Sequence, residues 1–235
     1  MKTSHTTWQM LIALTLTANL MATQIGPPVP SVKANKAVVG ALYNQQDFDL
    51  HFKEFGDLNT RTDSVQASVV YGFWDWGSVF GQIGGGTQDT HESSDSAMTW
   101  TAGFKAGRKC HTNWGLGVSG SASGVHAEHN IHNEKLPLDT FSWHVSATGS
   151  YTFDNLPVTI YGGPILTRID AEISRTIGKT KTGEDIKETF ESDNSTNVGI
   201  LTGVGFHTSK QLRCTIEALF ADSQQQYSVG MTYRF

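Results

Sequence analysis

The sequence predicts an all-β protein, a closed antiparallel up-and-down β-barrel that crosses a membrane with ten strands. Three observations predict this fold. Long segments alternate between apolar and polar residues, as a strand with one apolar face requires. The opposite face holds glycines, small polar residues and charges, whereas a soluble barrel or sandwich needs an apolar interior. The sequence also ends on such a strand, with Phe235 as its last residue.

The clearest strand is predicted at residues 139–153, in the segment TFSWHVSATGSYTF. Its apolar face carries Phe141, Trp143, Val145, Ala147, Gly149, Tyr151 and Phe153, and its polar face carries Ser142, His144, Ser146, Thr148, Ser150 and Thr152. This strand is longer than the usual length of about five or six residues. Its length suits a tilted crossing of a bilayer.

The remaining strands follow the same alternation. In chain order we expect all ten at 37–53, 63–74, 77–88, 96–107, 113–127, 139–153, 157–173, 195–207, 211–221 and 225–235. The first strand is the least regular, and Pro164 predicts a bulge in the seventh. Eight strands is the alternative, because boundaries drawn from a sequence shift by about two to four residues. An even number puts both chain ends on one side of the membrane.

Connection lengths and aromatic residues agree with a membrane barrel. WDWG, KCHTN, FDNLP and HTSKQ are short, whereas DLNTRTD, HESSDS, HNIHNEKLPLD and SRTIGKTKTGEDIKETFESDN are longer and polar; the last connection, ADSQQ, is the exception. Outer-membrane barrels have short periplasmic turns and long external loops. Aromatic residues such as Trp76, Trp114 and Trp100 fall near predicted strand ends, as the two interfacial belts of such barrels require.

The N-terminal residues predict a secretory leader. Lys2 precedes an apolar run from Met10 to Ala22, and a small residue closes that run, as in a signal peptide. We therefore expect a signal peptide at residues 1–22, a linker at 23–36 and the barrel domain at 37–235. Cleavage after Ala34 is the second option. No later stretch is apolar over the roughly 18–20 residues that a transmembrane helix needs.

Charge and cysteine content narrow the function classes. The formal net charge is -5, with 17% charged residues, which argues against a nucleic-acid partner. The two cysteines, Cys110 and Cys214, are too few for a disulfide scaffold. Both fall toward the short-turn end of the predicted barrel, on strands nearly opposite each other, so whether they pair stays open.

Two parts of the sequence resemble a known family. The run VVYGFWDWGSVFGQIGGG resembles a hairpin of the small outer-membrane β-barrels of the opacity-protein and outer-membrane-protein-A-like type, and the segment from Asn197 to Phe235 resembles their last three strands. The resemblance implies an eight- or ten-stranded barrel in the bacterial outer membrane, in contact with its lipid. It implies that the barrel-assembly machinery reads a terminal signal made by Tyr227, Val229, Met231, Tyr233 and Phe235. It carries over no catalytic residue and no cofactor.

The segment HAEHNIHNE brings together side chains that could hold a metal ion, namely His126, Glu128, His129, His132 and Glu134. Imidazole and carboxylate groups suit zinc, copper or nickel. Their spacing matches no closed metal site. We therefore expect a solvated external loop and no metal.

His144 and Ser146 share one face of a strand, so a base stands beside a hydroxyl, as at the start of a nucleophilic site. Their spacing resembles the His-x-Ser of lipid A deacylases, which are also small outer-membrane barrels. The alternation, however, points both side chains into the lumen, whereas that chemistry needs access to lipid. Ordinary lumen packing is the expectation, with no catalytic residue.

Charges of both signs are expected inside the barrel. Inward-facing positions are predicted for Lys105, Arg213, Glu217 and Arg234, together with Asp47, Asp49, His51 and Lys53 of the first strand. These charges should pair across the interior, because a barrel of ten strands or fewer is nearly filled by its own side chains.

These observations predict a non-enzymatic protein, a rigid scaffold that displays four external loops to an unidentified extracellular partner. The charged segment between Ser174 and Asn194 is the expected place for adhesion. A narrow passive channel is the first alternative, and an outer-membrane lipid hydrolase is the second. A soluble secreted ligand-binding barrel is the rival at the level of protein class.

Overall fold

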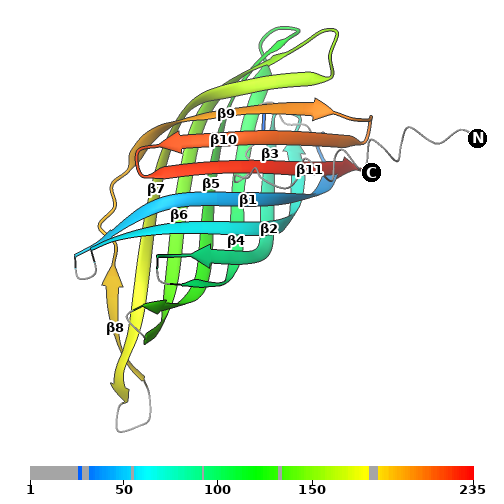
Figure 1. The fold of residues 1–235 in the computed structure, drawn as a ribbon. Coiled ribbons are helices and arrows are strands. Elements are labelled where there is room, and N and C mark those ends of the chain that lie inside the picture. The colour runs from blue at the N-terminus through cyan, green and yellow to red at the C-terminus, as the bar shows by residue number, and fades with distance from the viewer. Residues whose placement is uncertain (1–25, 28–31, 54–55, 92, 132–133, 180–184) are drawn as a thin grey trace, which may run out of the picture.

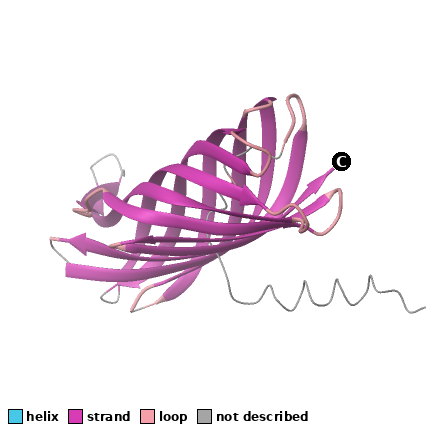
Figure 2. Cartoon of the chain, turned by 90° about the horizontal axis from the view of Figure 1, so that it is seen from above, coloured by secondary structure: helices cyan, strands magenta, loops and turns pink. Residues whose placement is uncertain are grey.

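The computed structural model describes residues 26–27, 32–53, 56–91, 93–131, 134–179 and 185–235. These residues form strands in chain order: β1 (Ala37–Phe52), β2 (Gly56–Trp74), β3 (Gly77–Asp89), β4 (Ser94–Lys109), β5 (Trp114–Ile131), β6 (Glu134–Thr152), β7 (Val158–Lys179), β8 (Asp185–Glu191), β9 (Asn197–His207), β10 (Leu212–Ala221) and β11 (Gln224–Arg234). Each paired strand runs antiparallel to its neighbours, and the strands curve around a common interior (Figure 2).

Ten of the strands close into a ring, which confirms the predicted barrel. Strands β1 to β7 pair in sequence order, and β9, β10 and β11 then lead back to β1. The end of the ring where β1 begins and β11 ends is called the terminal end here, and the opposite end is called the extended end. The short turns predicted from the sequence lie at the terminal end.

The eleventh strand, β8, lies outside the ring. It pairs with residues 172–179 of β7, whereas β9 pairs only with residues 158–167 of that strand. Figure 1 shows β7 and β8 reaching beyond the other strands, on the side away from the C-terminus. We call residues 174–179 and 185–190 the β7–β8 arm.

The long external loops predicted from the sequence are mostly strand, so that prediction was wrong. DLNTRTD lies inside β2, the HNIHNEKLPLD segment lies largely in β5 and β6, and the charged segment from Ser174 forms the arm. The apolar and polar positions exchange faces at the membrane boundary, and hydrogen-bonded pairing between neighbouring strands continues beyond it. This difference explains why pattern alone placed the strand ends too early.

No helix among the residues that the structure describes is long and apolar enough to cross a membrane.

Over its terminal half the barrel wall is apolar outside and mostly polar inside, where a small apolar cluster of Ile165, Leu201 and Leu219 is also buried. Outward residues such as Val69, Leu116 and Val145 are exposed, whereas Ser142, Ser146 and Ser228 are buried in the interior. Stacked and edge-on aromatic pairs lie at the terminal end, including Trp74 with Trp76 and Trp114 with Tyr151, and Trp100 and Phe141 lie farther along. An apolar exterior between two aromatic rims is the surface that a bilayer requires.

The polarity of the wall inverts at the extended end. Along β6 the outward side chain changes from Phe141 to Asp139, which is exposed, while the inward side chain changes from Ser142 to Leu138, which is fully buried. The outside of this part therefore suits water, and its inside packs like the core of a soluble sandwich. The membrane boundary lies where the two patterns change over.

An apolar cluster fills the interior of the extended end. Its buried members come from three strands: Phe48, Leu50 and Phe52 of β1, Leu136 and Leu138 of β6, and Ile169, Ala171 and Ile173 of β7, with Leu58 and Phe190 packed against them. Because β1 is not a neighbour of β6 or β7 in the ring, this packing spans the interior. We call this cluster the outer seal.

The outer seal overturns one prediction about the first strand. Asp49, His51 and Lys53 point outward and are exposed, and Asp47 is only partly covered. The inward positions belong instead to Phe48, Leu50 and Phe52. The inversion of the wall explains the inward positions of Phe48, Leu50 and Phe52, but Val38 and Leu42 are also buried inside, in the terminal half, so the two faces of the whole strand were assigned the wrong way round.

Candidate functional site

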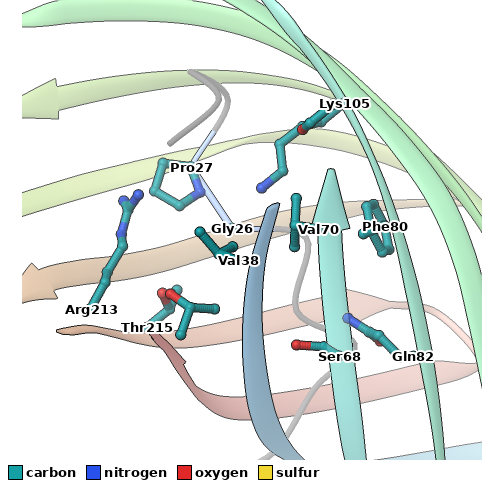
Figure 3. Close-up of a pocket in the computed structure, with 12 residues that line it drawn as sticks. Gly26, Pro27, Val38, Ser68, Val70, Phe80, Gln82, Lys105, Arg213 and Thr215 are labelled. Carbon is teal, nitrogen blue, oxygen red and sulfur yellow. The ribbon is translucent and has the colours of Figure 1, made fainter. Parts of the chain in front are cut away.

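A buried carboxylate organises the lumen at the terminal end. Glu217 of β10 is 2% exposed and accepts a hydrogen bond of 2.8 Å from the Tyr161 hydroxyl. Lys105 and Arg213 approach from opposite sides of the same space (Figure 3). The predicted inward positions of Lys105, Arg213 and Glu217 are thus confirmed, whereas Arg234 lies exposed at the end of β11.

Gly26 and Pro27 occupy this part of the lumen. The backbone N–H of Gly26 donates a hydrogen bond of 2.8 Å to Glu217, and Gly26 and Pro27 are both buried. Figure 3 shows the two residues between Lys105 and Arg213. The space left beside them is about 40 Å³, room for only a few waters. We call this arrangement the inner plug.

Sequence reasoning did not find the inner plug. It treated residues 23–36 as a linker, because no periodic pattern marks them. Two residues in the sequence could have indicated it. One is the glycine at position 26, which can adopt the observed φ of +71° that glycine tolerates best. The other is the glutamate at position 217, on the lumen-facing side of a predicted strand. If the leader is removed after Ala22, the inner plug stays with the mature chain; cleavage after Ala34 would remove it.

Gly26→Val should expel the inner plug. An added Cβ would lie 3.1 Å from the Lys105 ammonium and would strain the positive φ. Ser68 lines the same space, so a Ser68→Cys probe in a variant lacking Cys110 and Cys214 reports access from solution. We expect labelling by a charged maleimide to accelerate about tenfold, because labelling follows local opening.

Gly56→Val is the matched control for this experiment. Gly56 also has a positive φ, of +79°, but a Cβ there meets nothing within 4 Å. The control therefore reproduces the backbone strain without touching the lumen. Equal acceleration in both variants would contradict the inner plug.

The middle of the lumen is polar and buried. Its walls carry serine, threonine and glutamine side chains, among them Gln66, which donates a hydrogen bond of 3.0 Å to Thr99. His144 is 1% exposed and faces this interior. Ser146 shares a hydrogen bond of 2.7 Å with Ser119 and does not contact the imidazole through an observed hydrogen bond. A lipid hydrolase would need this pair on the outer face of the wall.

The histidines of HAEHNIHNE do not converge. His126 points outward and lies 2.5 Å from Asp139, whereas His129 is buried on the inner face, against Ser93 and Gln88. Burial lowers the pKa of His129, and the nearby Asp95 and Asp89 oppose this shift. Glu128 also points outward, and His132 lies outside the described residues. Among the residues that the structure places, no group of three or more metal-ligating side chains gathers.

An outer groove of about 540 Å³ lies on the exterior at the membrane boundary. Met98, Trp100 and Phe141 form its apolar floor, and the two aromatic rings are 6.4 Å apart. Its polar rim comes from charged residues of β5, β6, β7 and β8: His126, Asp139, Arg168, Asp170, Glu172 and Glu191. Sequence reasoning missed this groove, because its residues come from the successive strands β4 to β8, and only the register between these strands brings the side chains together.

The remaining predicted residues lie on the outside of the wall. Met231 and Tyr233 are exposed on β11 and Phe235 is 84% exposed, whereas Tyr227 and Val229 are half-buried. This placement agrees with a lipid-facing strand, and their role as an assembly signal stays a prediction. Cys110 and Cys214 are both free.

Comparisons with known proteins bear on the fold alone. No family model matches the chain, and no curated protein matches it significantly. Among solved structures, an outer-membrane channel of Pseudomonas putida F1 is similar with a TM-score of 0.50 at 9% identity, covering 90% of this chain and 100% of that one.

Two further solved structures are similar over most of their length. The translocator domain of the autotransporter NalP from Neisseria meningitidis gives a TM-score of 0.46 at 12% identity, covering 87% of this chain and 90% of that one. The attachment invasion locus protein Ail of Yersinia pestis gives 0.42 at 12% identity, covering 86% and 99%.

The closed ring, the apolar exterior between aromatic rims and the similarity of the fold to that of the channel lead to one conclusion. By its fold, this chain is a closed up-and-down β-barrel of the kind that bacterial outer-membrane proteins have.

Proposed function

We propose that this protein is a non-enzymatic surface scaffold, whose barrel holds the extended end outside the cell for contact with an extracellular partner. The observation that carries the proposal is the outer seal. Eight buried apolar residues of β1, β6 and β7 pack across the interior. The extended end therefore has a packed hydrophobic core of its own above the membrane.

The β7–β8 arm supports an interaction role. Ile177 is 58% exposed and Ile186 is 42% exposed, on a hairpin that extends past the rest of the barrel (Figure 1). Strand edges and exposed apolar side chains are the features that other proteins bind. Phe190 of the arm packs against the outer seal, so the barrel fixes the direction in which the arm points.

A narrow channel is the second candidate. The observation that favours it is the polar middle of the lumen, where side-chain atoms such as Ser121 Oγ, Thr140 Oγ1 and Asn44 Oδ1 are buried without a hydrogen-bond partner. Buried polar atoms of this kind usually bind water. In such a channel, water would fill the polar middle of the lumen, and conduction would require the outer seal and the inner plug to open.

Planar-bilayer recording tests the two candidates directly. The wild-type protein should insert and stay electrically silent, because the outer seal and the inner plug close the lumen in series. Insertion is checked independently by the shift between unheated and boiled bands on a gel. A steady unit conductance from the wild-type protein would contradict the scaffold and favour the channel.

Deleting Phe235 should impair assembly in cells. This residue is 84% exposed and forms an edge-on pair with Tyr233, with ring centroids 5.3 Å apart, so its loss removes little packing from the barrel. We therefore expect the deletion variant to refold in detergent with an ordinary heat-shifted band, yet to reach the outer membrane at a strongly reduced level.

Phe104→Ala serves as the control for the deletion. Phe104 is an exposed aromatic residue of β4, away from the terminus, 50% exposed. Normal membrane levels of the deletion variant would argue against an assembly signal at Phe235.

A further inference from the structure

We infer that the outer groove binds the headgroup of an outer-leaflet lipid that carries an ammonium group. The groove lies where the exterior of the wall changes from apolar to charged, so one lip faces acyl chains and the other faces water. Its volume, about 540 Å³, is within the range of small-molecule sites in proteins. The inference takes from the proposed function only the orientation that places the extended end outside the cell, and it does not depend on the scaffold role.

The apolar floor of the groove is shaped by a glycine. Gly124 lies between Trp100 and Phe141 in the cross-strand register of β4, β5 and β6. A Cβ on Gly124 would overlap the indole nitrogen of Trp100, so the ring lies across the position where a side chain would stand. An aromatic face held in this way is a favourable surface for a cationic headgroup.

The rim of the groove is a row of charges in direct register. His126 of β5 stands opposite Asp139 of β6, Asp139 stands opposite Glu172 of β7, and Glu172 stands opposite Glu191 of β8. Like charges directly opposite each other on neighbouring strands destabilise a sheet. Glu172 accepts a hydrogen bond of 3.3 Å from Ser174, which leaves its charge in place, and a bound cation would offset the repulsion between Glu172 and Glu191.

The charge balance of the rim selects the ligand. Four carboxylates face one guanidinium and one imidazole. Asp170 already lies 2.8 Å from the Arg168 guanidinium, and Asp139 lies 2.5 Å from the imidazole of His126, which leaves the Glu172 and Glu191 side with the excess negative charge. A headgroup with phosphate alone would be repelled there, whereas an ammonium group is attracted.

The position of the apolar floor indicates that the ligand of the groove comes from the membrane. Phe141 and Trp100 continue the exposed apolar wall that includes Val145 and Phe104. A ligand that covers Phe141 and Trp100 would have its apolar tail along this wall and its headgroup beside the carboxylates of Glu172 and Glu191. A lipid of the outer leaflet meets both conditions, because it is already oriented in this way by the bilayer.

Native mass spectrometry of the detergent-solubilised full chain tests the inference. The protein is mixed with equal amounts of phosphatidylethanolamine and phosphatidylglycerol with identical acyl chains. We expect phosphatidylethanolamine adducts to exceed phosphatidylglycerol adducts by about threefold, the effect of one or two partly exposed charge contacts. The Glu172→Gln/Glu191→Gln variant should lose this preference, and Gly124→Val should lose it through displacement of Trp100.

Asp49→Asn/Asp57→Asn is the matched control, because both residues are exposed carboxylates at the extended end on β1 and β2. This variant should keep the wild-type preference. Equal binding of the two lipids by the wild-type protein would overturn the inference. A preference that survives in the Glu172→Gln/Glu191→Gln variant, or one for phosphatidylglycerol, would overturn it as well. Heat-shifted bands show that each variant is folded, so a folding failure is not read as lost binding.

Discussion

Ionic conductance should appear only when both ends of the lumen are opened. Leu50 and Leu138 are fully buried in the outer seal, on strands that face each other across the interior. Leu50→Ser/Leu138→Ser removes the centre of this seal, and Gly26→Val removes the inner plug. Because the two closures act in series, we expect either change alone to leave the barrel silent. The triple variant should show a small, steady conductance in a planar bilayer.

Stability must be measured alongside conductance. Truncating a buried leucine costs about 2–5 kcal/mol, so each seal variant first has to show the heat-shifted band of a folded barrel. Conductance in the leucine variant alone would mean that Gly26 and Pro27 do not block the inner mouth. A silent but folded triple variant would mean that the polar side chains in the middle of the lumen close it by themselves.

The alternation in the sequence predicted the wall of the barrel well. Residues 139–153 were assigned outward and inward faces that the structure reproduces, with Val145 exposed and Ser142, His144 and Ser146 buried. The prediction succeeds because successive side chains of a strand point to opposite faces, so residues alternate between lipid and lumen with a period of two. It is a local property, and a sequence displays local properties directly.

The two seals and the outer groove could not be predicted in the same way. Leu50 and Leu138 belong to one buried cluster that spans the interior, and Gly26 is hydrogen-bonded to Glu217 at a separation of 191 residues. Contacts of this kind depend on strand order, tilt and register, which no local pattern encodes. The same limit applies to Phe48, Leu50 and Phe52 of β1, because the inversion of the wall is visible only once Asp139 and Leu138 are seen on opposite faces.

The glycine run at residues 84–86 of β3 should be essential for assembly of the barrel. A Cβ added to Gly84 would overlap the backbone carbonyl oxygen of Val65, and one added to Gly86 would overlap that of Asp63. Both obstacles are backbone atoms of β2, which cannot rotate away as a side chain would. We expect Gly84→Ala and Gly86→Ala each to cost about 3 kcal/mol or more in the free energy of unfolding, measured by urea titration in micelles.

Neighbouring glycines on the same strand provide the contrast that makes this prediction specific. A Cβ on Gly81 meets nothing within 4 Å, and one on Gly85 meets only the Ala97 carbonyl oxygen at 3.4 Å. Alanine at these outward positions should change stability little, because the strand keeps its pairing with β2 and β4. If Gly85→Ala destabilised the barrel as much as Gly84→Ala, loss of glycine flexibility would explain the effect. A large difference instead would show that β2 and β3 approach each other too closely for any side chain at the inward positions.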